Sequence, residues 1–144
     1  PLRGWHADLG DTPDLAPPLV ALAGALALGH FGQPVGSRFS GLGTLQGKES
    51  PRLEVLTDGL RRLGLSANFG EDWIEIPAAD ARVRELGLDP VVLDAAGDHR
   101  MAFAFGLLSL VRPSIRVLGP DCVAKSWPGF WSELEGLRAD PASM

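Results

Sequence analysis

An acid, an imidazole and a guanidinium stand in a row at Asp98, His99 and Arg100, directly before an apolar run over residues 101–111. Gly97 before them indicates a sharp turn, and Asp98 can cap a helix by accepting from its free N–H groups. Those N–H groups, with His99 and Arg100 beside them, would make an anion site. The alternative is a capped core helix with a surface salt bridge.

Other charged side chains stand at or near the starts of further expected helices. Together they are Asp14, Lys48, Glu49, Arg52, Asp98, His99, Arg100 and Lys125. If these helix ends converge, the cations and the helix dipoles would suit a small polyanion, either a phosphate or a carboxylate. The alternative is that each charge only decorates its own helix end; we favour this for any one of them but not for the set.

Hydrophobic periodicity and turn residues predict the elements that must position these side chains. We expect strands over 5–9, 37–40, 65–69, 73–76, 91–94 and 114–118, the fifth of them buried. We expect helices over 13–28, 51–63, 99–112 and 125–137, the second capped by Ser50 with Pro51 at its first position. Residues 77–89 read as a short helix or a surface loop.

The two halves of the chain agree in the order of their elements. Each has a strand, a loop with an acid, an Ala-rich buried helix, a strand with an arginine, and a helix introduced by Lys-x-x-Pro. An ordered agreement of this kind indicates an internal repeat. We therefore expect an α/β (α+β) fold built from β-α-β-α units with a closing hairpin, the first over about residues 1–76 and the second over about 90–138.

Composition limits the class of protein. A chain of 144 residues with 45% hydrophobic content fits one soluble domain. The net charge of −5 argues against nucleic-acid binding. Cys122 is the single cysteine, which excludes an internal disulfide and a Cys-rich metal site and fits a reducing, cytoplasmic compartment. We expect no metal, no cofactor, no membrane span and no signal peptide. A start at Pro1 indicates processing or a piece of a longer protein.

Four motifs, in this order, resemble the 3-phosphoshikimate 1-carboxyvinyltransferase (EPSP synthase) family, and the resemblance covers nearly the whole chain. They are Pro13-Asp14-Leu15-Ala16, Gly41-Leu42 with Lys48-Glu49-Ser50-x-Arg52-Leu53, Gly97-Asp98-His99-Arg100-Met101-Ala102, and Cys122-Val123-Ala124-Lys125-Ser126-Trp127-Pro128-x-Phe130-Trp131. The resemblance implies a transferase of the shikimate pathway, hence of aromatic amino acid biosynthesis. It also implies an inside-out α/β fold of repeated β-α-β-α-β-β units, of which residues 1–144 hold about two of six.

By resemblance, the complete enzyme transfers the enolpyruvyl group of phosphoenolpyruvate to the 5-hydroxyl of shikimate 3-phosphate and releases phosphate. Arg52, Arg100 and Lys125 match the positions that bind phosphoenolpyruvate, and guanidinium forks suit its carboxylate and phosphate. Asp14 and Lys48 match contacts to shikimate 3-phosphate. The fragment would need the rest of the enzyme chain as its partner, or would associate with itself to cover its exposed side.

The same resemblance suggests the catalytic groups. Asp14 matches the proton acceptor, and Glu49 stands where proton transfer at the substrate methylene is plausible. His99 is a secondary candidate, and the alternative for it is a structural hydrogen-bonding role. Pro51 departs from the family pattern, which usually has Asp there, and so removes a charge that could steady Arg52. The alternative function is an isolated anion-binding or catalytically degenerate module.

Overall fold

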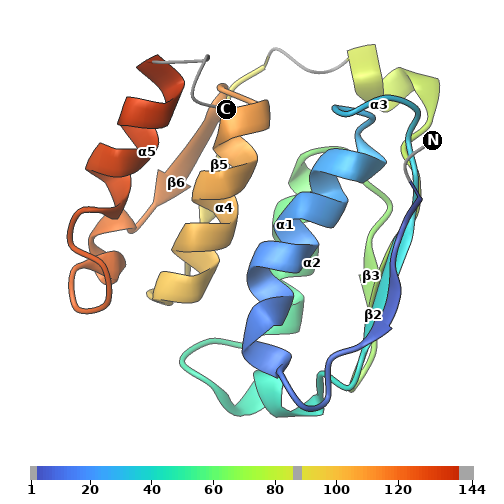
Figure 1. Ribbon diagram of the computed structural model, residues 1–144, viewed down its shortest axis with the longest axis horizontal. Helices are drawn as coiled ribbons and strands as arrows, with labels where there is room; N and C mark the ends of the chain where they lie inside the picture. The colour runs from blue at the N-terminus through green and yellow to red at the C-terminus, as the bar shows by residue number, and fades with distance from the viewer. Residues whose placement is uncertain (1–2, 86–88, 140–144) are drawn as a thin grey trace.

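The computed structural model describes residues 3–85 and 89–139 and combines helices with two sheets (Figure 1). The strands are β1 (His6–Asp8), β2 (Ser37–Ser40), β3 (Asn68–Phe69), β4 (Ile74–Ile76), β5 (Val91–Asp94) and β6 (Ile115–Leu118). The α-helices are α1 (Ala16–Ala27), α2 (Arg52–Arg62), α3 (Ala81–Glu85), α4 (His99–Val111) and α5 (Phe130–Ala139). Three 3₁₀ helices are η1 (Pro13–Leu15), η2 (Gly43–Gly47) and η3 (Pro120–Val123). The mixed α/β class is confirmed.

The first sheet has the strand order β1-β2-β4-β3. β1 pairs parallel with β2, so the chain must cross over between them, and α1 makes that crossover. β4 pairs antiparallel with both β2 and β3, and β3 and β4 form the predicted hairpin. The second sheet pairs β5 parallel with β6, with α4 as the crossover. The turn η1 just before α1 carries Asp14, and α4 follows directly after Asp98.

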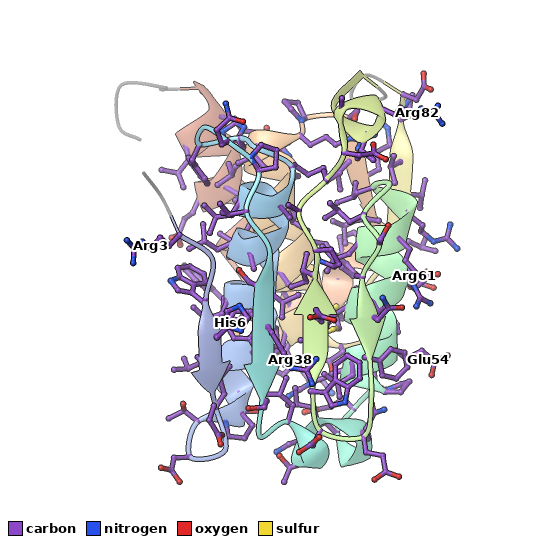
Figure 2. The ribbon with its side chains drawn as sticks, turned by 90° about the vertical axis from the view of Figure 1, so that its right-hand side faces the viewer. Arg3, His6, Arg38, Glu54, Arg61 and Arg82 are labelled. Carbon is purple, nitrogen blue, oxygen red and sulfur yellow. The ribbon has the colours of Figure 1, made fainter. Side chains whose placement is uncertain are left out.

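The four-stranded sheet has one apolar and one polar face. Along β2, Ser37 and Phe39 are buried, whereas Arg38 and Ser40 point to the other face and are partly exposed. Figure 2 looks onto this polar face, where His6 and Arg38 lie on neighbouring strands. The Arg38 guanidinium stacks 4.2 Å from the centre of the Trp73 ring. No described helix covers this face, so the core lies on the other side.

The core lies among α1, α2 and α4 (Figure 1). Close approach depends on glycine: a Cβ on Gly24 would lie 2.7 Å from Leu60 Cδ2, and one on Gly59 would lie 2.6 Å from Phe105 Cε1. Ala16, Ala23 and Ala27 on α1 are fully buried. Ala102 and Ala104 on α4 are also fully buried, so the prediction of a buried helix with alanines in each half is confirmed. The small residues let the three helices pack closely.

Several predicted details are wrong. Ser50 does not cap α2: the helix begins at Arg52, Pro51 is the N-cap residue without a side-chain cap, and the Ser50 hydroxyl donates to Asp98 instead. The hydrogen bond that the hydroxyl donates to the buried, ionised carboxylate is charge-assisted and therefore stronger than a neutral capping bond, so it sets the orientation of the Ser50 side chain. The first helix, in contrast, opens as the 3₁₀ turn η1, which agrees with an irregular first turn expected from Pro17 and Pro18. α5 begins at Phe130, after the Lys125–Pro128 stretch.

β5 is less buried than predicted. Leu93 is the one residue of this strand that is buried, and Val92 is 49% exposed. A sheet of two strands with helices on one side leaves its other face open to solvent. The ambiguous stretch 77–89 contains α3, although residues 86–88 lie outside the described part. Within the described residues, no helix is long and apolar enough to cross a membrane.

Candidate functional site

The turn between β5 and α4 places Asp98 at the centre of the site. Ala96 and Gly97 both adopt left-handed backbone conformations, with φ of 52° and 71°. Glycine adopts this conformation freely, but for alanine it costs energy, and such strain is common at functional sites. The Asp94 carboxylate accepts from the Ala96 N–H at 2.8 Å and holds the turn. The predicted sharp turn before Asp98 is confirmed.

Asp98 caps α4, as its position predicted. Its Oδ1 accepts from the backbone N–H of Arg100 at 2.9 Å, and its extended backbone is that of an N-cap residue. The carboxylate is completely buried. A buried carboxylate is costly unless it is paired and hydrogen-bonded, so its remaining lone pairs must have partners.

Arg52 is the main partner of Asp98. Its Nε donates to Asp98 Oδ2 at 2.7 Å and its Nη2 donates to Oδ1 at 3.3 Å, so the pair is bidentate. The Ser50 hydroxyl also donates to Oδ2, at 2.9 Å. The Arg52 side chain is 1% exposed. A guanidinium from the start of α2 is therefore fixed to the acid that caps α4.

The pKa of Asp98 reflects two opposed effects. Burial alone would raise the pKa of this carboxyl, but the hydrogen bonds from Arg52, from Ser50 and from the Arg100 N–H outweigh it. The pKa of Asp98 therefore lies below that of an ordinary aspartate. The carboxylate stays ionised at neutral pH and keeps Arg52 paired.

Two further acids contact the other edge of the Arg52 guanidinium. Nη1 donates to Asp14 Oδ1 at 3.1 Å, and Nη2 donates to Glu49 Oε2 at 2.6 Å. Unlike Asp98, these acids face solvent: the Asp14 side chain is 46% exposed and that of Glu49 is 55% exposed. One edge of the guanidinium thus faces a buried acid and the other faces two accessible acids.

Arg100 completes the cluster from the first turn of α4. Its Nη2 lies 3.4 Å from Asp14 Oδ2, and its Nη1 donates to the Asp14 backbone carbonyl at 3.3 Å. The side chain is 38% exposed, so it also reaches solvent. Asp14, which sits in η1 just before α1, therefore lies between the guanidinium groups of Arg52 and Arg100.

The structure brings five of the predicted charged residues together, from the starts of α1, α2 and α4. They are Asp14, Glu49, Arg52, Asp98 and Arg100. For this set, the alternative that each charge only decorates its own helix does not hold. We call these five residues the ionic cluster. It contains two guanidiniums and three carboxylates, so an anionic ligand would need more positive charge from its surroundings.

The other predicted residues lie outside the cluster. Lys48 and Lys125 are exposed, and neither makes an ion pair or hydrogen bond within the part of the chain that the structure describes. The His99 ring packs edge-on against Phe103, with 5.8 Å between the ring centres. Among residues 3–85 and 89–139, no group of three or more His, Cys, Asp or Glu side chains is arranged to hold a metal ion.

Sequence reasoning missed two parts of this site. It expected Asp98 to cap α4 beside an anion site but did not identify Arg52 as its buried partner, and it expected Ser50 to cap α2, whereas Ser50 donates to Asp98. A signal for the first was present: a capping acid before a fully apolar helix implies burial, and a buried acid needs a cation. Pro51 supplies no charge to Arg52, but Arg52 forms ion pairs with three other acids.

Residues 1–134 match the family EPSP synthase (3-phosphoshikimate 1-carboxyvinyltransferase). The chain is 36% identical over 135 residues to the 3-phosphoshikimate 1-carboxyvinyltransferase of Methanoculleus marisnigri, a match covering 94% of this chain and 29% of the relative. It is 35% identical over 137 residues to the enzyme of that name from Dehalococcoides mccartyi, covering 95% and 29%.

A shorter match extends the comparison to a further bacterium. Over 107 residues the chain is 39% identical to the 3-phosphoshikimate 1-carboxyvinyltransferase of Pseudomonas syringae pv. syringae, covering 73% of this chain and 24% of the relative. The chain thus spans less than a third of the length of these relatives. The match over residues 1–134 includes every helix start of the ionic cluster. The resemblance seen in the four motifs is confirmed, and the chain belongs to the EPSP synthase family.

Proposed function

We propose that this chain supplies one wall of the active site of an enolpyruvyl transferase. The complete enzyme would transfer the enolpyruvyl group of phosphoenolpyruvate to the 5-hydroxyl of shikimate 3-phosphate and release phosphate. One observation carries the proposal: the buried Arg52 guanidinium is fixed by Asp98 along one edge and has the accessible acids Asp14 and Glu49 at its other edge. An anion-binding group and two proton-transfer candidates therefore share one site.

Arg52, Arg100 and Lys125 would bind phosphoenolpyruvate. Both guanidiniums can make forked bonds to a carboxylate or phosphate. The three acids of the ionic cluster outnumber its two guanidiniums, so the exposed Lys125 and Lys48 would add the positive charge that two anionic substrates require. Lys48 and Asp14 would contact shikimate 3-phosphate, and the two substrates would thereby be held next to each other.

Asp14 and Glu49 would move the protons. Asp14 would accept the proton of the attacking 5-hydroxyl, and Glu49 would transfer a proton to or from the methylene carbon of phosphoenolpyruvate. Both acids reach solvent in this chain. His99 stays a secondary candidate, since its aromatic contact with Phe103 also suits a structural role.

We further propose that residues 1–76 and 90–138 are two repeated units of one lobe, and that turnover needs the rest of the enzyme. The orders β1-α1-β2-α2-β3-β4 and β5-α4-β6-α5 support a shared β-α-β-α plan. The chain spans 29% of the length of its relative from Methanoculleus marisnigri, which supports the proposal that turnover needs the rest of the enzyme. The second candidate is an anion-binding or catalytically degenerate module, which the extensive neutralisation of Arg52 by acids favours.

The test uses the complete gene product that carries this chain. We expect phosphate release only when phosphoenolpyruvate and shikimate 3-phosphate are both present. Arg100→Ala should raise the half-saturating phosphoenolpyruvate concentration by about tenfold to a hundredfold, because a charge-assisted hydrogen bond contributes about 1.5–3 kcal/mol. Arg62→Ala is the matched control, since Arg62 pairs with Asp58 on the exposed side of α2. Unchanged saturation in Arg100→Ala would make Arg100 structural.

Calorimetric measurement of substrate binding separates the two candidate functions. Binding of both substrates without phosphate release by the complete gene product would favour the degenerate module. Absence of binding would count against both functions and leave the ionic cluster as a structural element.

A further inference from the structure

We propose that Asp98 is the positioning residue of this site: it fixes the orientation in which Arg52 presents its free edge to phosphoenolpyruvate. The inference rests on the proposed function. It assigns Asp98 a role in substrate affinity that the capping of α4 does not require, and it gives Ser50 a supporting part through the same carboxylate.

The guanidinium of Arg52 is held along one of its edges. A guanidinium is planar and rigid, so fixing one edge also fixes where the other edge points. The Asp98 carboxylate accepts hydrogen bonds from Nε and from one hydrogen of Nη2. The remaining donors of Nη1 and Nη2 point toward Asp14 and Glu49, on the accessible side. The edge available to a ligand is therefore the edge that Asp98 leaves free.

Burial decides which acid holds Arg52 in place. Asp14 and Glu49 are about half exposed, so their ion pairs are screened by water and their side chains can move aside for a ligand. Asp98 is fully buried and its carboxylate accepts from Ser50 and from the Arg100 N–H as well. A buried pair with every lone pair engaged is costly to break. Asp98 is thus the fixed partner and the other two acids are exchangeable.

The same carboxylate connects the two proposed arginine ligands. It accepts from the Arg52 side chain on α2 and from the Arg100 backbone on α4. The left-handed pair Ala96 and Gly97 brings it to this position. Movement of Asp98 would therefore change the spacing of both guanidiniums, and a misplacement of about 1 Å can cost two orders of magnitude in rate.

The test is Asp98→Asn in the complete gene product, assayed with phosphoenolpyruvate and shikimate 3-phosphate. Asparagine caps helices as well as aspartate does, but its amide cannot accept the two bonds from Arg52 while also serving Arg100. We expect the half-saturating phosphoenolpyruvate concentration to rise tenfold or more, with less than a threefold change for shikimate 3-phosphate. Asp58→Asn is the control, because Asp58 also pairs with an arginine on α2 but at the exposed surface.

The Arg52→Lys background distinguishes positioning from loss of structure. Lysine lacks the second edge of the fork, so Asp98→Asn should raise the phosphoenolpyruvate requirement less than twofold in that background. The positioning role would be overturned if Asp98→Asn raised the half-saturating phosphoenolpyruvate concentration by the same factor with and without Arg52→Lys. It would also be overturned if Asp98→Asn alone left that concentration unchanged. If Asp98→Asn does not fold, Ser50→Ala takes its place: we expect a rise of about twofold to fivefold that disappears with Arg52→Lys, and a persistent rise would contradict the proposal.

If the proposed function itself is wrong, the experiment gives a different result from the one expected if only the positioning role is wrong. In that case the unmodified protein itself neither binds phosphoenolpyruvate nor releases phosphate, and the positioning role is rejected together with it. Normal turnover by the unmodified protein, with no response to Asp98→Asn, rejects the positioning role alone.

Discussion

Glu49 Oε2 lies 2.6 Å from Nη2 of Arg52, three residues further along the chain. The acid proposed for proton transfer and the guanidinium proposed for substrate binding therefore form one ion pair. Because the Glu49 side chain is 55% exposed, this pair contributes little to folding. A ligand anion that binds Arg52 would compete with Glu49 and release its carboxylate from the ion pair.

Glu49→Gln tests that relationship. We expect the turnover number of the complete gene product to fall about 10²–10⁴-fold, which is the usual contribution of a positioned acid or base. The free energy of unfolding should change by less than about 0.5 kcal/mol, since the side chain faces solvent. Steady-state kinetics and urea denaturation measure the two quantities. Glu54→Gln, at an exposed position in the first turn of α2, is the control, and a turnover number within twofold of the unmodified protein would exclude Glu49 from proton transfer.

Lys125→Met tests the need for charge from outside the ionic cluster. Lys125 is exposed and makes no ion pair within the described residues, so its loss should leave the midpoint of thermal unfolding unchanged. We expect the half-saturating phosphoenolpyruvate concentration to rise about tenfold, equivalent to about 1.4 kcal/mol. Arg82→Met serves as the surface-charge control. Equal effects from both substitutions would indicate general electrostatics and not a specific contact.

The pH dependence of stability follows from the lowered pKa of Asp98. An unfolded aspartate titrates near pH 3.9, and the folded carboxyl titrates lower. The stabilisation is therefore fully present above about pH 4 and is lost as the pH falls through the folded pKa. Urea denaturation between pH 7 and pH 3 should show the stability difference between the unmodified protein and Asp98→Asn shrinking below about pH 4. A constant difference over that range would mean that Asp98 does not titrate differently on folding.

Helix packing gives a prediction that is independent of function. In Gly59→Ala the new Cβ would lie 2.6 Å from Phe105 Cε1 and 2.8 Å from its Cζ, so we expect a loss of about 1–3 kcal/mol in the free energy of unfolding. Gly136→Ala is the matched control on α5, where the added Cβ meets no atom within 4 Å. That substitution should be neutral or stabilising by up to about 1 kcal/mol, because alanine favours helix. Chemical denaturation compares them, and a stable Gly59→Ala would disprove the tight contact between α2 and α4.

Local sequence signals account for much of the fold. Strands at 37–40 and 91–94 have the predicted bounds, and the hairpin of β3 and β4 was also predicted. These signals succeed because alternation, glycine turns and helix caps act over a few residues. The predictions that fail are those in which a distant group competes with a local one. Ser50 is the example, since it donates to Asp98 across the core and does not cap its own helix.

The sequence by itself determined the family, the α/β class and the residue types that could bind an anion. It could not determine which of the charged residues contact each other, because Arg52 and Asp98 lie far apart in the chain and meet only when α2 and α4 pack together. Nor could it show that Asp98 is buried while Asp14 and Glu49 reach solvent. That difference, which separates a fixed acid from two exchangeable ones, arises from tertiary packing, since burial and not residue type sets the strength of an ion pair.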